Sequence, residues 1–156
     1  MFTVRPMEHR DAAACTDIVN FIIRQGGTTA YEEEYSVEDF DAHYREEAEV
    51  CLVAETEGKV AGFQGMFDVG HGVLSIGSFA DQSDPKRGVG RALIEGSIAE
   101  AKKRGFKSII AKITSDNAPG LAYYSRMGFD DDHIIPNDHT RTDGTKVDRI
   151  VKRLTL

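Results

Sequence analysis

The segment DPKRGVGRALIEGSIAEAKKRG, residues 84–105, decides the fold of this chain. It predicts a glycine-containing loop that leads directly into a helix, and Gly105 stands where a helix commonly ends in a left-handed cap. Gly88 and Gly90 flank Val89 and lack Cβ atoms, so a ligand can approach the backbone closely. The unpaired N–H groups of the first helical turn attract an anion, above all a phosphate. The segment therefore predicts a phosphate-binding loop.

Strand-like runs lie on both sides of this loop and helix. GVLSIGSFA (72–80) precedes the loop, and FKSIIAKI (106–113) follows the helix. An isolated Gly-x-Gly is most often only a tight turn, but strand, glycine loop, helix and strand in this order commonly bind a phosphate-bearing cofactor. The segment is not a P-loop, because no Gly-Lys-Ser/Thr follows, and it is not a Rossmann fingerprint, because the third glycine is absent.

The run KRGVGRALIEG (86–96) resembles motif A of the GNAT superfamily of N-acetyltransferases, whose usual form is Gln/Arg-x-x-Gly-x-Gly/Ala. The first position of that motif falls on Pro85, which has no N–H to donate, so other groups must supply its contacts. The resemblance implies that acetyl-CoA is the co-substrate. It also implies that the cofactor phosphates meet the loop residues Arg87, Gly88, Val89, Gly90 and Arg91.

A second landmark of the same family lies in ITSDNAPGLAYYSRMGF (113–129). The family pattern Asn-x(6)-Tyr-x-x-x-Gly-Phe matches Asn117, Tyr124, Gly128 and Phe129. Asn117 is also a suitable N-cap for a short helix. Its side chain therefore has two interpretations, a hydrogen bond to the cofactor or the helix cap alone.

The two landmarks extend the resemblance over residues 2–154. It implies an α/β (α+β) fold with a mixed, mostly antiparallel sheet flanked by about four helices. Two neighbouring parallel strands, about 72–82 and 106–113, would splay apart. The pantetheine of the cofactor would lie in the gap and bond main-chain groups near Phe79 and Ala80.

The other elements follow from apolar periodicity and from capping and turn residues. We expect a strand at 2–6, a helix from Cys15 to near Gly26, a helix from Ser36 to near Glu47, a hairpin of strands 50–55 and 59–67 that turns at Glu57-Gly58, and a final strand at 146–154 paired with one that starts at Phe129. The polar tail between the last two strands is expected to hold a loop.

Composition sets broad limits on the class of protein. A chain of 156 residues suits a single domain, residues 2–156, with a real core. No apolar leader or membrane-length run is present, so we expect a cytoplasmic protein. A net charge of -7 argues against nucleic acid and against anionic membranes as partners. Cys15 and Cys51 fall in apolar patterns, which favours two buried free thiols.

The transfer of an acetyl group from a thioester to an amine needs a neutral amine, a polarised carbonyl and a proton for the departing thiolate. Tyr124 suits the role of acid, because a phenol with a pKa near 10 is protonated at neutral pH. Neighbouring residues on a helix point about 100° apart, so we expect only one of Tyr123 and Tyr124 to face the cofactor. The resemblance selects Tyr124. The alternative is that Tyr124 only packs in the core.

Several carboxylates and one histidine are candidates for the general base. They are the run 32–34 and the residues Asp68, His71 and Asp81. A run of three glutamates is more often a solvated surface, and many such enzymes remove the amine proton through water. His133, Asp138 and His139 have no fixed ligand spacing, so no metal site is expected.

The segment GTTAYEEEYSVEDF (27–40), with VRPMEHRDAAACTDIVNFII (4–23), resembles the branch of phosphinothricin and methionine-sulfoximine acetyltransferases. This implies an N-acetyltransferase that moves an acetyl group to the primary amine of a small amino acid or analogue, by direct attack in a ternary complex. Thr28, Tyr31, Glu32 and Glu33 would then shape the acceptor pocket. The alternatives are a protein or peptide N-acetyltransferase and a non-catalytic acyl-CoA-binding sensor. Many relatives form homodimers, so a homodimer is a further expectation.

Overall fold

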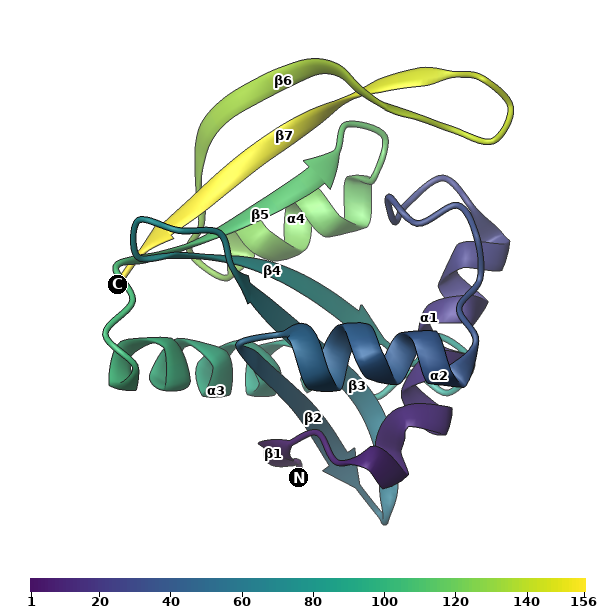
Figure 1. The fold of residues 1–156 in the computed structure, drawn as a ribbon, viewed down its shortest axis with the longest axis vertical. Helices are drawn as coiled ribbons and strands as arrows, with labels where there is room; N and C mark the ends of the chain where they lie inside the picture. Colours follow the sequence, from purple (N-terminus) through teal and green to yellow (C-terminus); the bar gives the residue numbers. More distant parts are fainter.

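Seven strands form one mixed sheet in the order β1-β2-β3-β4-β5-β7-β6 in the computed structural model, which describes residues 1–156 (Figure 1). The strands are β1 (Thr3–Pro6), β2 (Val50–Thr56), β3 (Lys59–Asp68), β4 (Val73–Ala80), β5 (Ser108–Thr114), β6 (Asp130–Thr140) and β7 (Lys146–Thr155). Only β4 and β5 pair in parallel; every other neighbouring pair is antiparallel. The predicted mixed, mostly antiparallel sheet is confirmed.

Four α-helices connect the strands, with two short helical segments of other types. They are η1 (His9–Asp11, 3-10), α1 (Ala12–Gln25), α2 (Val37–Phe40), η2 (Asp41–Glu47, a π-helix), α3 (Val89–Lys103) and α4 (Ala118–Arg126). The predicted caps are confirmed, because α1 ends at Gly26 with φ of 70° and the Ser36 hydroxyl accepts a hydrogen bond from the Asp39 N–H. None of the helices has the length and apolar character that crossing a membrane requires.

The strands alternate their side chains between two cores, one on each face of the sheet. On one face, Leu93 of α3 packs in a cluster with Leu52 and Ile76. On the other face, Val19 of α1 packs in a cluster with Phe63. Because residues i and i+2 of a strand share a face, each central strand contributes to both clusters. The sheet is therefore covered on both sides by helices.

β4 and β5 separate soon after they meet. Only residues 73–75 of β4 pair with 108–110 of β5, although β4 continues to Ala80 and β5 to Thr114 (Figure 1). Beyond this point β4 pairs with β3 alone and β5 with β7 alone. The predicted splay is confirmed, and it leaves residues 76–80 without a strand partner on the side that faces β5.

The C-terminal hairpin is longer than the sequence suggested. β6 runs through most of the polar tail, with two register irregularities against β7, and the connecting loop is confined to residues 141–145. Most side chains of β6 are exposed, so this strand lacks the apolar alternation by which strands are found in a sequence. The expected loop in the tail is therefore mostly strand.

Candidate active site

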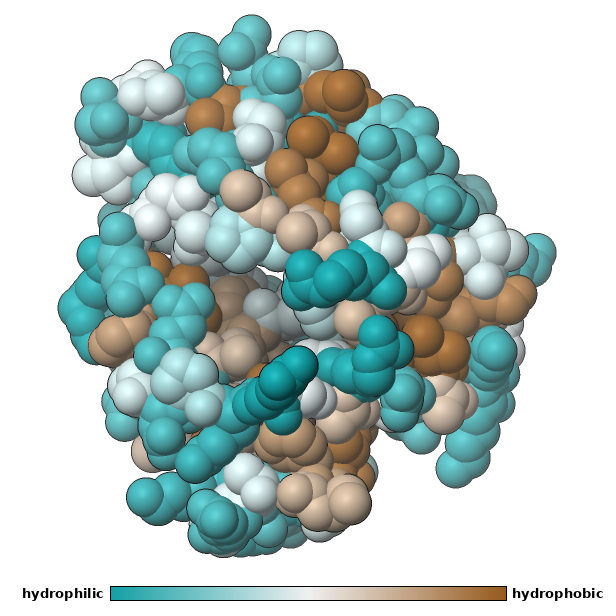
Figure 2. Space-filling model, turned by 180° about the vertical axis from the view of Figure 1, so that it is seen from behind, coloured by the Kyte–Doolittle hydropathy of each residue, from teal (hydrophilic) through white to brown (hydrophobic).

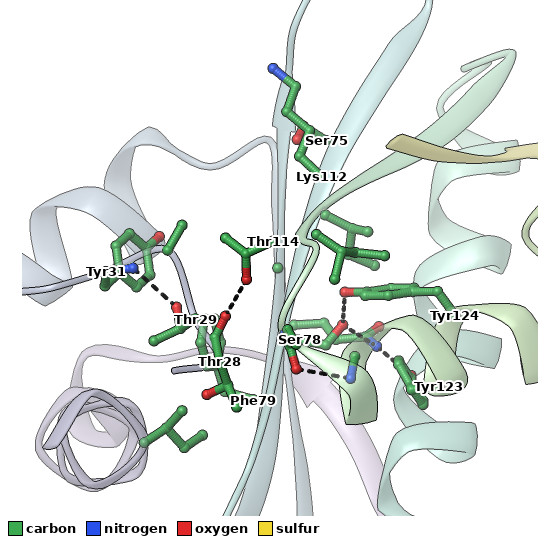
Figure 3. Close-up of a pocket in the computed structure, with 18 of the residues that line it drawn as sticks. Thr28, Thr29, Tyr31, Ser75, Ser78, Phe79, Lys112, Thr114, Tyr123 and Tyr124 are labelled. Carbon is green, nitrogen blue, oxygen red and sulfur yellow. Dashed lines mark hydrogen bonds between the residues drawn. The ribbon is translucent and has the colours of Figure 1, made fainter. Parts of the chain in front are cut away.

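A cavity of about 620 Å³ opens where β4 and β5 part. Its lining comes from both faces of the sheet, with Gly90 of α3 and Tyr124 of α4 from one side and Ile22 of α1 and Tyr31 from the other. Figure 2 shows the back of the molecule hollowed near its middle, with strongly hydrophilic residues around the rim. In Figure 3, Thr28 and Tyr31 lie on one side of the two strands, and Tyr124 lies on the other. The cavity thus reaches through the sheet.

The glycine loop lies at the start of α3. Gly88 is the N-cap residue and has φ of 90°, in the left-handed region that side chains rarely adopt. Among the residues assigned to the cofactor, Phe79, Ala80, Gly90 and Asn117 line the cavity. Arg87, Gly88, Val89 and Arg91 do not line it. The first and last of these four are exposed, and Val89 is buried in the core.

Both tyrosines of α4 line the cavity, which differs from the expectation that only one faces it. The cavity extends around enough of the helix to meet two side chains about 100° apart. The Tyr123 hydroxyl donates to the Gly90 carbonyl oxygen at 2.7 Å, and the Tyr124 hydroxyl lies 2.7 Å from the Ser78 hydroxyl. Burial raises the pKa of the Tyr124 phenol above its usual value, so it is protonated at neutral pH.

Asn117 caps α4 and also lines the cavity. Its Oδ1 accepts a hydrogen bond from the Gly120 N–H at 3.0 Å. The cap interpretation of this residue is therefore confirmed, and a contact with the cofactor stays a prediction.

The predicted acceptor residues separate into two pairs. Thr28 and Tyr31 line the cavity, whereas Glu32 and Glu33 do not. Glu32 instead accepts hydrogen bonds from His139 at 2.9 Å and from Arg141 at 3.0 Å. Burial alone would raise the pKa of the Glu32 carboxyl, but bonds from His139, Thr142 and Arg141 lower it to about 2. Glu32 therefore anchors its own loop by binding the side chains of His139 and Arg141.

Arg141 is the partner of that anchor, and it was not singled out from the sequence. Its guanidinium donates to the carbonyl oxygens of Thr29 at 2.6 Å and Thr28 at 3.2 Å. It also donates to Asp116 at 2.6 Å and to the Thr114 hydroxyl at 2.9 Å. The side chain is only 8% exposed. Arg141 thus ties residues 28–32 to the end of β5, and it lies in a polar tail with no motif to mark it.

No carboxylate lines the cavity. The other candidate bases, Asp68, His71 and Asp81, are not among its lining residues either. Asp68 accepts a hydrogen bond from the Gly70 N–H, and Asp81 accepts from the Ser83 N–H, so both stabilise loops. Apart from the tyrosines, the ionisable side chains in the lining are those of His43, Lys112 and Arg149.

A sheet that parts between two parallel strands, with a glycine loop at a helix start and a tyrosine in the gap, is the arrangement that the resemblance to the GNAT superfamily implies. The chain belongs to the acetyltransferase (GNAT) family, whose family model matches residues 20–129. Acetyltransferases of this family use acetyl-CoA as the acetyl donor.

Two known proteins illustrate the similarity in sequence. A Bacillus subtilis (strain 168) protein with the provisional name phosphinothricin acetyltransferase YwnH is 30% identical over 145 residues, which cover 86% of this chain and 87% of that protein. The [ribosomal protein bS18]-alanine N-acetyltransferase of Escherichia coli (strain K12) is 34% identical over 76 residues, 49% of this chain and 51% of that protein. That match spans only about half the length of the curated relative.

The fold matches solved structures over its whole length. The crystal structure of a GNAT superfamily phosphinothricin acetyltransferase from Sinorhizobium meliloti, in complex with AcCoA, superposes with a TM-score of 0.86. The match covers 99% of this chain and 88% of that one at 18% identity. The predicted GNAT-type fold is confirmed.

Proposed function

We propose that residues 2–156 form one catalytic domain that transfers the acetyl group of acetyl-CoA to the primary amine of a small molecule, by direct attack in a ternary complex. The acceptor that we infer is an amino acid or analogue with a free carboxylate. The observation that carries the proposal is the cavity between β4 and β5, which is lined from both faces of the sheet. Two substrates that enter from opposite faces would meet at its centre.

The side of α3 and α4 suits the acetyl donor. Residues 76–80 of β4 have no strand partner toward β5, so their main-chain groups are free to bond an extended amide-containing arm, as Phe79 and Ala80 were expected to do. The start of α3 offers free N–H groups and a left-handed Gly88 for the phosphates. Arg87 and Arg91 are exposed beside that turn and supply positive charge.

The opposite side suits a small acceptor with a negative group. Its walls include the aromatic rings of Tyr31, Tyr44 and Phe67. The cations in the lining are Lys112 and Arg149, and no carboxylate is among the lining residues. The buried Nε of Arg149 makes no hydrogen bond within the chain, although Asp138 lies 3.5 Å away. The relatives named as phosphinothricin acetyltransferases match most of this chain, which favours an amino-acid-like acceptor.

The reaction assigns one role to Tyr124. The amine nitrogen attacks the carbonyl carbon, the carbon–sulfur bond breaks, and the thiolate takes the Tyr124 proton. The amine proton passes to solvent, because no carboxylate lines the cavity and the imidazole of His43 is hydrogen-bonded to Glu47. Binding both substrates in one cavity converts a bimolecular encounter into a positioned reaction.

The test is acetyl-CoA-dependent release of free thiol across a panel of acceptors. The panel pairs amino acids, including phosphinothricin and methionine sulfoximine, with the matching amines that lack the carboxylate, and it adds short peptides. We expect turnover with one amino acid class and much slower turnover with its decarboxylated partner. Tyr124→Phe should lower kcat by about 10²–10⁴-fold. Tyr35→Phe is the matched control, since Tyr35 does not line the cavity.

Other outcomes of this panel would contradict the proposal in distinct ways. A preference for peptides would favour a protein N-acetyltransferase. Binding of acetyl-CoA without turnover on any amine, together with indifference to Tyr124→Phe, would favour a sensor.

A further inference from the structure

A row of hydrogen-bonded polar side chains crosses the core between α3 and the cavity. Ser97 of α3 and Gln64 of β3 are 0% and 1% exposed, at positions where their neighbours on the same face are apolar. Gln64 connects Ser97 to Ser78 of β4 and to Tyr123. Ser78 in turn reaches Tyr124 (Figure 3). Buried polar groups of this kind are retained when every donor and acceptor has a partner.

The direction of the first bonds follows from the Gly90 carbonyl, which can only accept. Tyr123 must donate its single hydroxyl proton to that oxygen, at 2.7 Å. The Tyr123 oxygen can then only accept from Gln64, at 2.8 Å, so the Gln64 atom that faces it is the amide nitrogen. The hydroxyl proton of Tyr123 is therefore donated to the Gly90 carbonyl oxygen.

The direction of the remaining bonds follows from Gln64. Its Oε1 accepts from the Ser97 hydroxyl at 2.7 Å, and the second hydrogen of its Nε2 goes to the Ser78 oxygen at 3.0 Å. Ser78 therefore accepts from Gln64 and keeps its own hydroxyl proton for another partner. That partner is the Tyr124 hydroxyl, at 2.7 Å.

We propose that Ser78, oriented by Gln64, donates a hydrogen bond to the Tyr124 hydroxyl, so that Tyr124 keeps a free proton for the departing thiolate while the proton of Tyr123 is held by Gly90. Ser78 and Gln64 are thus positioning residues for the proposed acetyl transfer, on which this inference rests. When the carbon–sulfur bond breaks, the proton of the Tyr124 O–H passes to sulfur. The phenolate left behind accepts the Ser78 hydrogen bond until solvent returns a proton.

The chemistry of Tyr124 agrees with this arrangement. Burial raises the pKa of its phenol, which disfavours the phenolate, and the bond with Ser78 opposes that effect. A donor aimed at the oxygen that becomes charged is most effective in a site that excludes water. The arrangement also distinguishes Tyr124 from Tyr123, although both line the cavity. The sequence motif selects Tyr124 only by its spacing, whereas the hydrogen bonds indicate which hydroxyl proton is free.

The experiment compares Ser78→Ala, Ser78→Thr, Tyr124→Phe and the double variant Ser78→Ala/Tyr124→Phe. Ser125→Ala is the matched control, since Ser125 is the next residue on α4 and its hydroxyl contacts Lys152, outside the cavity. We expect Ser78→Ala to lower kcat about tenfold with little change in the KM of acetyl-CoA, and Ser78→Thr to restore it. The double variant should be no slower than Tyr124→Phe alone, because the two groups act as one unit.

Gln64→Glu tests the direction of the chain with almost no change of shape. Burial raises the pKa of the new carboxyl, and once ionised it can only accept, so above that pKa Ser78 would turn its proton toward position 64 and Tyr124 would have to donate to Ser78. We expect kcat to fall at least as far as in Ser78→Ala. If this buried carboxylate prevents folding, the Ser78 variants carry the test.

A readout without turnover uses protein labelled at the tyrosine Cζ carbon and observed by NMR. The chain has five tyrosines, and Tyr124→Phe identifies the signal of Tyr124 by its loss. A phenol that accepts a hydrogen bond has its Cζ signal shifted upfield, and one that donates has it shifted downfield. We expect Ser78→Ala to move the Tyr124 signal downfield and Ser125→Ala to leave it in place.

Three results would overturn the inference. They are an upfield shift in Ser78→Ala, a kcat within twofold of the parent in that variant, or additive losses in the double variant. Each leaves the proposed acetyl transfer intact if Tyr124→Phe is still slow. Failure of the proposed function would appear differently, as no turnover by the parent enzyme, and the NMR result would still decide the direction of the bond.

Discussion

Gly90 shows how a single residue links the glycine loop to the tyrosines of α4. A Cβ built on Gly90 would lie 2.6 Å from the Tyr123 Cε1 atom, and the Gly90 carbonyl receives the Tyr123 proton. The second glycine of the motif therefore makes room for a ring as well as for a ligand. The contact with the Tyr123 ring thus explains why residue 90 is a glycine.

We expect Gly90→Ala to destabilise the protein by about 1–3 kcal/mol, because the ring must shift to relieve the overlap. Urea unfolding followed by circular dichroism measures this difference. In a Tyr123→Leu background, which removes the nearest ring atoms, Gly90→Ala should lower the free energy of unfolding by much less. An equal loss in both backgrounds would show that Tyr123 is not the reason for the glycine.

Residues within a local motif could be predicted from the sequence, and those defined by distant partners could not. Gly88, Gly90, Asn117 and Tyr124 stand at fixed spacings, and the structure places the last three around the cavity. Gln64 and Ser78 act through partners 14 to 59 residues away. A buried polar residue in phase with the apolar face of its strand was the available signal for Gln64, and periodicity alone does not name its partners.

The C-terminal hairpin acts as a clamp on residues 28–32, the loop that borders the cavity. Arg141, at its tip, holds the carbonyl oxygens of Thr28 and Thr29 and pairs with Glu32 and Asp116. The Thr114 hydroxyl also donates to the Thr28 oxygen at 2.7 Å. The loop that borders the cavity is thus positioned from the opposite end of the chain.

We expect Arg141→Met to raise the KM of the acceptor about tenfold. The KM of acetyl-CoA should stay unchanged, since residues 28–32 do not form the side of the cavity, at α3 and α4, where acetyl-CoA is proposed to bind. The free energy of unfolding should fall by about 2–3 kcal/mol. This is less than the loss of a fully buried ion pair would cause, because the Glu32 and Asp116 side chains are 26% and 36% exposed. Lys146→Ala, on the same hairpin and exposed, is the control. Equal effects on both KM values would contradict the clamp.

The stability difference of Arg141→Met should also depend on pH. The Arg141 guanidinium is the main cause that lowers the pKa of Asp116. With His139 and Thr142, it also lowers the pKa of Glu32 to about 2 from an ordinary value of 4.5. Because the folded pKa is the lower one, the stabilisation is complete above about pH 4.5 and is lost as the pH falls through about 2. Thermal unfolding at pH 7 and pH 3 should therefore show a smaller difference between parent and variant at the lower pH.

At the scale of the whole molecule, the mixed, mostly antiparallel sheet and the parting of β4 from β5 were implied by the family resemblance, whereas the order of the seven strands was not predicted. The cavity was predicted only as a consequence of the family resemblance, since its walls combine α1, α4 and residues 28–31 from both faces of the sheet. The long exposed β6 was missed, because polar residues on an edge strand leave no alternating pattern.

The most direct measurement is calorimetric titration of acetyl-CoA into the parent protein and into Gly88→Glu. Gly88 has φ of 90°, and a glutamate there would place a negative charge at the start of α3, where the phosphates are proposed to bind. Arg91→Glu keeps the backbone unstrained, and Lys146→Ala serves as the control. We predict about 100-fold weaker binding for Gly88→Glu, an intermediate loss for Arg91→Glu and no change in the control. Unaltered affinity in both glutamate variants would contradict the assignment of the cofactor to this loop and to the cavity between β4 and β5.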